Sequence, residues 1–222
     1  NFAQTMTHIP PPAGVLSLNT NATIEVQKDV LSIAFSTTRE GADAQAVQSQ
    51  LKQALDAALA EARKVAKPGQ VEVQTGNFAL YPRYGNPNKD GQPSITGWQG
   101  STELMVSGKD SGTIASLAGR IKSMSIARVQ WQLSREAREK VEGEAAAQAI
   151  ARFRAQAAQM AQAFGYKGYS VREVQVSLNE QGHAPQPMMM SRAKGAMADE
   201  ALPTEGGKGD VVANVSGSVQ MQ

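Results

Sequence analysis

The sequence predicts an α+β fold in which helices pack on one side of antiparallel sheets, in the order β-β-α-β-β-α-β-α-β-β. Three observations support this prediction. Several segments place an apolar residue at every second position, as half-buried strands do. Other segments repeat their apolar residues at spacings of three and four, which is typical of amphipathic helices. Neighbouring strand segments are joined by turn residues, which indicates hairpins rather than parallel crossover units.

The first third of the chain contains an arm, two strands and a helix. Residues 1–14 include three consecutive prolines and show little periodicity, which predicts an N-terminal arm. In TIEVQKDVLSIAF the period of two runs to Val26 and resumes at Leu31, so two strands are joined tightly at Lys28-Asp29. From about Asp43 to Ala66 the period becomes helical. The predicted apolar face of this helix comprises Val47, Leu51, Leu55, Leu59, Ala62 and Val65.

A hairpin, a short helix and a further strand follow. The segments VEVQTGNFALYPRY and ITGWQGSTELMVSG flank GNPNKDGQPS, which is rich in turn-forming residues. Asp110 is a predicted N-cap for the short helix. In IARVQWQLS the alternation predicts a strand with one buried face, ending before Ser134, a predicted N-cap of the long helix. The residues predicted on that face are Ala127, Val129, Trp131 and Leu133.

The long helix includes the alanine-rich stretch AQAIARFRAQAAQMAQAFGYKG, from Ala147 to Gly168. A membrane-surface helix carries Lys or Arg along its polar face, whereas the second half of this helix carries glutamines. We therefore predict that the helix packs on a sheet of its own chain and ends at Gly165. Its predicted contact stripe comprises Ile150, Phe153, Ala157, Met160 and Phe164, with alanines on the flanks that allow close approach.

The last third of the chain predicts two strands separated by a loop. In GYSVREVQVSL the apolar parity shifts between Val171 and Val174, which indicates a β-bulge. Periodicity is lost from about Asn179 to Lys208, where we expect a mobile loop. The final strand, DVVANVSGSVQMQ, places six residues on one face: Val211, Ala213, Val215, Gly217, Val219 and Met221.

Composition excludes several classes of protein. The 222 residues include 22 basic and 20 acidic side chains, a formal charge of +2 that gives no electrostatic case for nucleic-acid binding. No apolar run approaches the roughly 20 residues of a membrane-spanning helix, so no integral membrane span is expected. Cysteine is absent, which removes disulfides, thiolate catalysis and cysteine-ligated zinc. The start at Asn1 fits removal of a leader, although trimming of the chain would look the same.

The sequence predicts neither catalysis nor a cofactor. The two histidines, His8 and His183, fall in the arm and in the aperiodic loop, where no scaffold would position them for catalysis. No G-x-S-x-G elbow occurs. The run GGKG at residues 206–209 has no strand before it or helix after it to aim backbone N–H groups at a phosphate.

Two other clusters are candidate sites. The loop segment HAPQPMMMSRAKGAM carries soft thioether ligands of the kind that suit Cu(I). The alternative is a mobile loop that merely contains methionine. The metal candidates are His183, Met188, Met189, Met190 and Met197. Around the predicted hairpin, aromatic residues mark either an interface or one end of the core. These interface candidates are Tyr81, Pro82, Tyr84 and Trp98.

From about Val15 to Gln222 the chain resembles the SIMPL-domain family of secreted bacterial proteins, described as periplasmic immunogenic or oxidative-stress defence proteins. The resemblance rests on FALYPRYGNPNKDGQPSITGWQGSTELMV, on AFGYKGYSVREVQV and on the ending VVANVSGSVQMQ. The family often has Pro-Asp where this chain has Lys28-Asp29, and Gly-Glu where it has Gly209-Asp210. Both differences keep the acidic residue.

The resemblance implies an α+β domain over residues 15–222, export to the periplasm and assembly into homo-oligomers, in some members large rings or channels. It implies no established enzymatic activity and supplies no catalytic residues. We therefore expect a non-enzymatic periplasmic or secreted protein that self-associates and contributes to stress defence. An envelope-associated protein is a further expected partner. The alternative is a protein that binds a ligand or copper through its methionine-rich loop.

Overall fold

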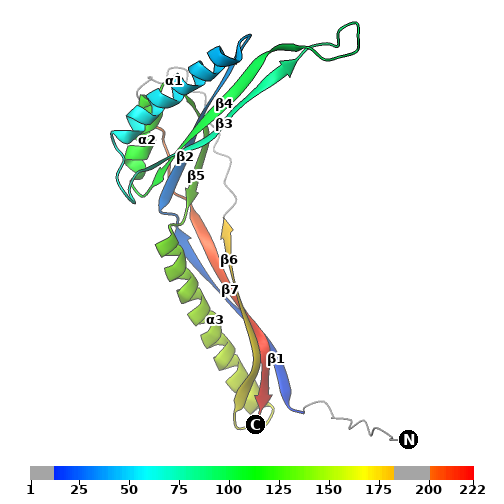
Figure 1. Cartoon of the computed structure of the whole chain (residues 1–222). Coiled ribbons are helices and arrows are strands. Elements are labelled where there is room, and N and C mark those ends of the chain that lie inside the picture. Colours follow the sequence, from blue (N-terminus) through cyan, green and yellow to red (C-terminus); the bar gives the residue numbers. More distant parts are fainter. Residues whose placement is uncertain (1–12, 183–200) are drawn as a thin grey trace, which may run out of the picture. The chain divides into compact units, whose positions relative to one another are not determined.

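The computed structural model describes residues 13–182 and 201–222, and it confirms the predicted order of elements. The chain forms two compact units, one built mainly from residues 27–134 and the other from the two ends of the chain together with residues 135–184. Their elements are drawn in Figure 1. In chain order the elements are β1 (Val15–Gln27), β2 (Val30–Gly41), α1 (Ala44–Arg63), β3 (Glu72–Tyr84), β4 (Ile95–Gly108), α2 (Ser111–Arg120), β5 (Ser125–Gln132), α3 (Arg135–Ala163), β6 (Tyr169–Gly182) and β7 (Lys208–Met221).

The unit of residues 27–134 contains a four-stranded antiparallel sheet in the order β3-β4-β2-β5. Helices α1 and α2 lie on the same side of this sheet (Figure 1). Alternate residues of the central strands β2 and β4 face the helices and are fully buried. The largest of these core side chains are Leu31, Ile33, Phe35, Leu104 and Val106.

The helices of this unit begin at side-chain caps. Asp43 accepts a hydrogen bond from the N–H of Gln45, at 3.3 Å, ahead of α1. The predicted cap Asp110 is confirmed, because its carboxylate accepts from the N–H of Thr113 at 3.2 Å. The fully buried row of α1 differs in part from the predicted face, since Leu55, Leu59 and Val65 pack only against the margin of the core. The buried row is Val47, Leu51, Ala54, Ala58 and Ala62.

Strand β5 is less buried than its alternation predicts. It forms one edge of the sheet, and its register against β2 shifts between Ala34 and Phe35, which leaves Ala127 out of the pairing. Ala127 is exposed, and the side chain of Val129 is 39% exposed. Trp131 packs against the core and Leu133 is buried. An edge strand has a neighbour on one side only, so even its inward-facing residues retain contact with solvent.

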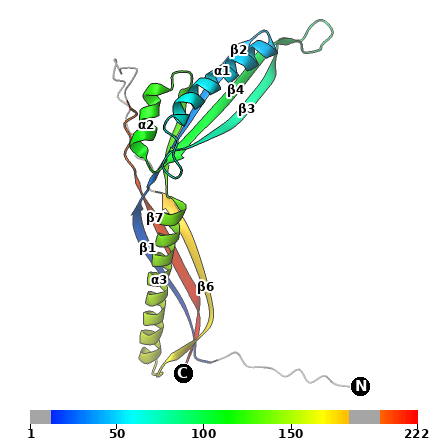
Figure 2. The same ribbon diagram turned by 60° about the vertical axis from the view of Figure 1, so that its left-hand side comes forward.

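The other unit contains a three-stranded sheet in the order β1-β7-β6, so the last strand of the chain lies at its centre. Helix α3 runs along one face of this sheet (Figure 2). The six residues predicted on the inner face of β7 are confirmed, with Val211, Ala213, Val215 and Val219 almost fully buried. The alanine-rich helix therefore packs on a sheet of its own chain, as predicted.

The contact stripe of α3 differs from the predicted one. Phe153 and Ala157 are buried as predicted, but Ile150 is 40% exposed and Phe164 is 64% exposed. The buried residues recur at every fourth position, and each step of four turns about 40° past a full helical turn. The row therefore winds around α3, as contact with a twisted sheet requires. It comprises Val141, Ala145, Ala149, Phe153, Ala157 and Ala161.

Helix α3 ends as predicted at Gly165, whose positive φ of 86° places it in the left-handed region. The N–H of Tyr166 donates to the carbonyl of Ala161 at 2.8 Å, and that of Gly165 donates to Gln162 at 3.0 Å. These two bonds form a Schellman motif, which satisfies carbonyls at the end of the helix. The chain then enters β6.

The predicted bulge in β6 is confirmed, because the register against β7 shifts between Val171 and Glu173. Strand β6 continues to Gly182, past Asn179, where periodicity is lost in the sequence. Residues 183–200 lie outside the described part of the chain, as do residues 1–12 of the predicted arm.

The loop between β1 and β2 is held by Asp29. The hydroxyl and the backbone N–H of Ser134 both donate to its carboxylate, each at 2.7 Å. Burial by itself would raise the pKa of Asp29, but these two hydrogen bonds outweigh it and hold the pKa below its ordinary value. Nearby, the N–H of Lys28 donates to the carbonyl of Gly207 at 3.0 Å.

Replacing Asp29 with asparagine should lower the free energy of unfolding by about 1 kcal/mol at neutral pH, because one charged acceptor is lost at a partly exposed site. The folded-state pKa lies below the value of about 3.9 for an unfolded chain. The stabilisation is therefore present above that value and is lost as the pH falls through the folded-state pKa. Urea unfolding at pH values between neutrality and strong acid measures the difference between wild type and variant, which should shrink below about pH 4.

The same substitution at Asp56, exposed on α1, is the control. It should change the free energy of unfolding by less than about 0.5 kcal/mol. A difference between wild type and Asp29→Asn that stays constant down to strongly acidic pH would show that the charge of Asp29 does not stabilise the fold.

Candidate interaction surfaces

The hairpin of β3 and β4 extends past the rest of its sheet. Gly41, the last residue of β2, lies opposite Trp98 of β4, which lies opposite Pro82 of β3. Beyond these residues the hairpin is a ribbon of two strands (Figure 1). The N–H of Gly85 donates to the carbonyl of Ser94 at 2.9 Å and closes the ribbon before the turn. A two-stranded ribbon has little core of its own, so its side chains remain accessible to solvent.

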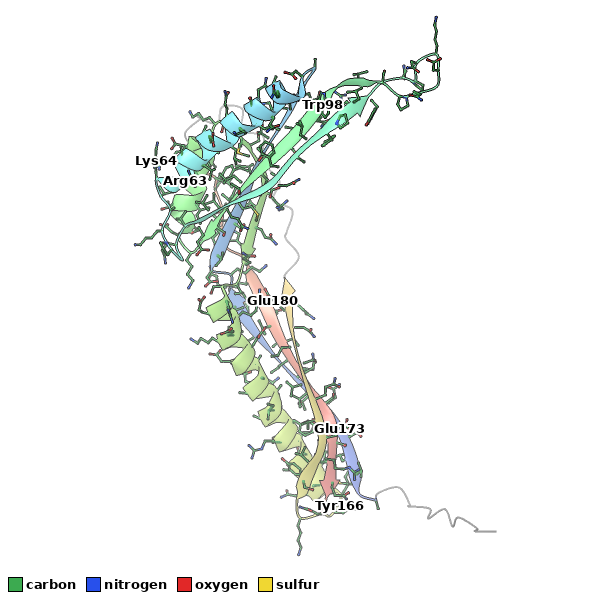
Figure 3. All side chains as sticks on the ribbon, viewed as in Figure 1. Arg63, Lys64, Trp98, Tyr166, Glu173 and Glu180 are labelled. Atoms are coloured by element: carbon green, nitrogen blue, oxygen red, sulfur yellow. The ribbon has the colours of Figure 1, made fainter. Side chains whose placement is uncertain are left out.

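Of the four interface candidates, Tyr84 lies on this ribbon, Pro82 and Trp98 lie at its base, and Tyr81 lies one residue before it, so they do not share one face of the hairpin. Tyr84 is 62% exposed and Tyr81 is 46% exposed, whereas Pro82 and Trp98 are half-buried. Pro82 and Trp98 are opposite each other and share one face, while Tyr81 is opposite Gln99 on the other face. Trp98 is labelled in Figure 3. The sequence therefore located an accessible aromatic segment, but not a single aromatic patch.

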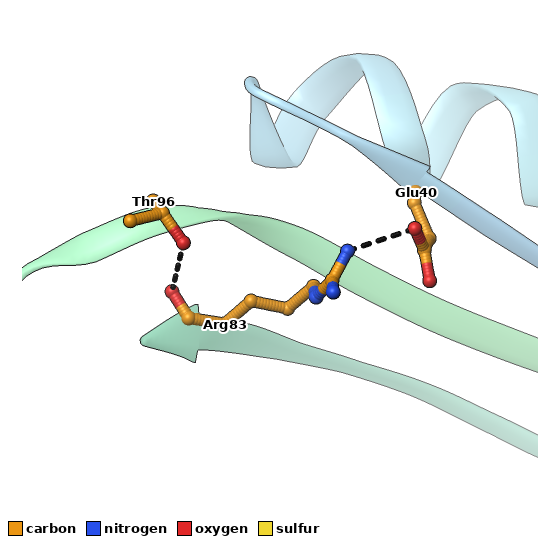
Figure 4. Close-up of polar contacts among 3 residues, drawn as sticks. All are labelled: Glu40, Arg83 and Thr96. Atoms are coloured by element: carbon orange, nitrogen blue, oxygen red, sulfur yellow. Dashed lines mark hydrogen bonds and ion pairs between the residues drawn. The ribbon is translucent and has the colours of Figure 1, made fainter. Parts of the chain in front are cut away.

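An ion pair occupies the face of the hairpin that carries Tyr81. Nη1 of Arg83 lies 2.8 Å from Oε2 of Glu40, and the hydroxyl of Thr96 donates to the carbonyl of Arg83 at 3.3 Å (Figure 4). Both charged side chains are about half exposed. Such a pair contributes at most about 1 kcal/mol to stability. This face therefore combines one exposed tyrosine with a solvated ion pair.

A second apolar surface lies along β6. Its apolar side chains face the α3 side of the sheet, because their partners on β7 face that side. They are exposed because β6 is an edge strand. In Figure 3 the labels on Glu173 and Glu180 mark most of the length of this strand. The exposed fractions are 52% for Val171, 49% for Val174, 44% for Val176 and 39% for Leu178.

One row of α3 borders the same edge. Arg138 forms an ion pair with Glu180 of β6 at 3.2 Å, and the carbonyl of Arg154 accepts from the hydroxyl of Tyr169 at 3.3 Å. These two residues belong to the row 138, 142, 146, 150 and 154, which runs beside the buried row. Ile150 therefore lies on the β6 side of the helix. The β6 surface is defined here as Ile150, Val171, Val174, Val176 and Leu178.

Sequence reasoning missed this surface. The run V-x-V-x-L at residues 174–178 predicts a half-buried strand, but it does not show whether a neighbouring strand covers the outer edge. One signal was available. No charged residue interrupts the run between Glu173 and Glu180, whereas exposed edges are often protected by charges.

The described residues show no preformed metal centre. Within residues 13–182 and 201–222, no group of three or more histidine, aspartate or glutamate side chains is close enough to hold a metal ion. The candidates His183, Met188, Met189, Met190 and Met197 lie outside the described residues, as does His8. Copper binding by the methionine-rich segment therefore stays a prediction.

Two carboxyl groups with shifted pKa values have structural roles. Hydrogen bonds from the hydroxyl and N–H of Thr113 lower the pKa of Asp110 at the start of α2, and Asp29 accepts from Ser134 as described above. The GGKG run is also part of the fold, since Gly206 packs beside Trp131 and Lys208 pairs with Glu25 at 3.1 Å. Among the described helices, none has the length and apolar character needed to span a membrane.

Fold and surfaces together define an α+β protein with two antiparallel sheets, one covered on one face by α1 and α2 and the other by α3, and with accessible apolar side chains at sheet edges. The family model of SIMPL, described as a protein of unknown function (DUF541), matches residues 16–219. The chain therefore belongs to the SIMPL family, as its sequence motifs predicted. No curated protein matches the chain at a significant level.

Proposed function

We propose that this protein is a non-enzymatic protein of the bacterial cell envelope that acts by self-association. The observation that carries the proposal is the β6 surface, where five apolar side chains are 39–52% exposed along one sheet edge. Contiguous apolar surface of this kind marks interaction sites more often than it marks plain solvent-facing surface. The free N–H and C=O groups of an edge strand add the capacity to pair with another strand.

The second accessible region is the outer half of the β3–β4 hairpin with Tyr81, Tyr84 and Trp98. Tyrosine and tryptophan are enriched in protein interfaces, since they bury a large area and keep one polar group for hydrogen bonding. A chain with two separate accessible regions can contact more than one neighbour. Repeated contacts of this type build closed or extended assemblies rather than isolated dimers.

Sedimentation velocity across a dilution series tests the proposal. Species larger than one chain of 23.5 kDa should appear at micromolar to submillimolar concentration and decrease on dilution. Multi-angle light scattering should give the corresponding mass. A protein that remains strictly monomeric at submillimolar concentration contradicts the proposed function.

Location in the envelope and a role in stress defence form the second half of the proposal, and they are supported by the resemblance to exported members of the family. Detection of the natural protein in the fraction released by osmotic shock tests the location. Comparison of oxidant survival in cells with and without the protein tests the role. Retention in the cytoplasm, or equal survival, contradicts the respective part.

A further inference from the structure

We propose that β6 pairs antiparallel with β6 of a second copy about a two-fold axis at Val176, which joins two three-stranded sheets into one of six strands. This inference rests on the proposed self-association and names the surface and partner that provide it. The occupant is a strand because an edge offers a row of backbone donors and acceptors that only another extended chain satisfies in register.

The other edges are protected in ways that β6 is not. On β1, Nη1 of Arg152 donates to the backbone carbonyl of Asn21 at 2.7 Å, which blocks the middle of that strand. On β3, the register shifts between Thr75 and Phe78, and Pro82 lacks an N–H donor. Bulges and proline are common means of protecting an edge from pairing.

Strand β5 is short and carries a register shift together with the charged Arg128. The bulge of β6 lies near its start, between Val171 and Glu173, so the strand from residue 174 to residue 182 pairs regularly with β7. That stretch contains no proline and no lysine, and its single charge is Glu180. Among the edge strands β3, β5 and β6, strand β6 therefore has the longest unprotected edge.

The sequence of β6 is self-complementary about Val176. In an antiparallel pair centred there, Val176 lies opposite Val176 of the second copy, and Val174 lies opposite Leu178 of the second copy. These residues all face the α3 side, so three apolar cross-strand pairs form on one face. On the other face Gln175 lies opposite Ser177, and these polar side chains remain in water.

Neighbouring registers are less favourable. Centring the pair on Gln175 places Leu178 opposite Arg172 at the bulge, and centring it on Ser177 places Val174 opposite Glu180. Each alternative puts a charged residue against an apolar one. The register at Val176 pairs no like charges between residues 174 and 178, because none of these residues is charged.

The two helices fit beside this junction. Helix α3 packs mainly on β7, and the two copies of β7 would lie three strand spacings apart, or about 14 Å. That separation exceeds the roughly 8–10 Å between packed helices, so the helices do not collide. The space between the two α3 helices lies over Val174, Val176 and Leu178 of both copies. Ile150 of each copy borders this space.

The area of the junction sets its expected strength. Seven paired residues extend about 23 Å along the strand. The contact is about 20 Å high, because it includes the thickness of the sheet and of the helix on it. The area buried is then roughly 900 Å² when both copies are counted. This area lies below the roughly 1,200 Å² at the lower end of stable interfaces. We therefore expect reversible pairing with a dissociation constant in the micromolar range. Other contacts would strengthen this pairing in a larger assembly.

Single cysteines test the register, because the natural chain has none. Opposite side chains in an antiparallel pair have their Cβ atoms about 5 Å apart, close to the separation in a disulfide. With oxidised glutathione as electron acceptor, Val176→Cys should form a disulfide-linked dimer. Val174→Cys and Leu178→Cys should each stay largely unlinked alone and should form a dimer when mixed. Val129→Cys, on the edge strand β5, is the matched control and should stay unlinked.

A charge at the axis tests the energetic role of the contact. Val176→Lys places two lysines opposite each other and should weaken self-association by about tenfold or more in sedimentation velocity. Val129→Lys alters a valine of similar exposure, 39% against 44%, and should leave self-association within about twofold of wild type. Circular dichroism establishes that both variants are folded.

The outcomes separate this inference from the proposed function. If wild type self-associates while Val176→Cys stays unlinked and Val176→Lys associates normally, the β6 contact is wrong and self-association stands. If Val174→Cys links with itself as readily as Val176→Cys does, the axis at Val176 is wrong. If wild type is monomeric throughout the dilution series, both proposals fail.

Discussion

Replacing Phe35 with alanine should lower the free energy of unfolding by about 3–5 kcal/mol, because the change removes a large buried ring and leaves a cavity. Phe35 is 1% exposed and lies at the centre of the core formed by β2, β4 and the two helices. The central strand is held on both sides, so its backbone is poorly able to move inward and fill the space. Equilibrium unfolding in urea, followed by circular dichroism, measures the change.

Ile126 is the matched control for this substitution. It lies opposite Phe35 in the pairing of β2 with β5, but its side chain is 39% exposed. Ile126→Ala should therefore cost about 1 kcal/mol, since part of the side chain is already in water. Equal losses for the two variants would show that the position in the strand, rather than burial, determines stability in this sheet.

Replacing Gly217 with alanine should destabilise the unit of β1, β6, β7 and α3 by about 3 kcal/mol or more. A Cβ atom at Gly217 would lie 2.2 Å from the carbonyl oxygen of Glu173 and 2.9 Å from Cα of Val174. Both atoms belong to the backbone of β6 next to its bulge, so no side-chain rotation relieves the clash. The pairing of β6 with β7 must shift, and urea unfolding detects the cost.

Gly143 on α3 is the opposite case and provides the control. A Cβ atom there meets nothing within 4 Å. Gly143→Ala should therefore raise the free energy of unfolding by about 0.5–1 kcal/mol, because alanine has the higher helix propensity. A loss of stability in Gly143→Ala equal to that in Gly217→Ala would contradict the steric explanation.

The order of strands and helices could be predicted from the sequence because each element carries a strong local signal. Period-two alternation, the turn residues between β3 and β4, the cap at Asp110 and the exit at Gly165 all depend on neighbouring residues. The bulge in β6 was predicted for the same reason, since an extra residue changes the apolar parity within a few positions. The family motifs were recognised for the same reason, because each is a short local run of residues.

What could not be predicted depends on contacts between distant segments. The contact row of α3 follows the twist of the sheet, so Ala145 and Ala149 are fully buried while the larger Ile150 is 40% exposed. Hydrophobicity alone would predict that Ile150 is more buried than Ala145 and Ala149. Likewise, the apolar residues of β6 have the pattern of a covered strand, and only the strand order of the sheet shows that no described strand lies on its other side.

The exposure of the aromatic segment could be predicted in part, whereas its role as an interface stays a prediction. The sequence located Tyr81 and Tyr84 in an accessible segment, but the separation of Tyr81 from Trp98 depends on which residues lie opposite each other in the ribbon. The β6 surface combines side chains from α3 and from β6, two elements whose distance in space is set by packing alone. Its recognition required the structure.

The place of β7 determines when the fold can be completed. Most of one core comes from the continuous segment 27–134, so those residues can find their partners as soon as they have emerged during synthesis. In the other sheet, β1 and β6 are both neighbours of β7, which follows all the other described elements in the chain. Strand β1 must therefore wait for its partner until every other described element has been made. The unit that contains β1 therefore completes its core later than the other unit, and the apolar side chains of β1 stay exposed in the meantime.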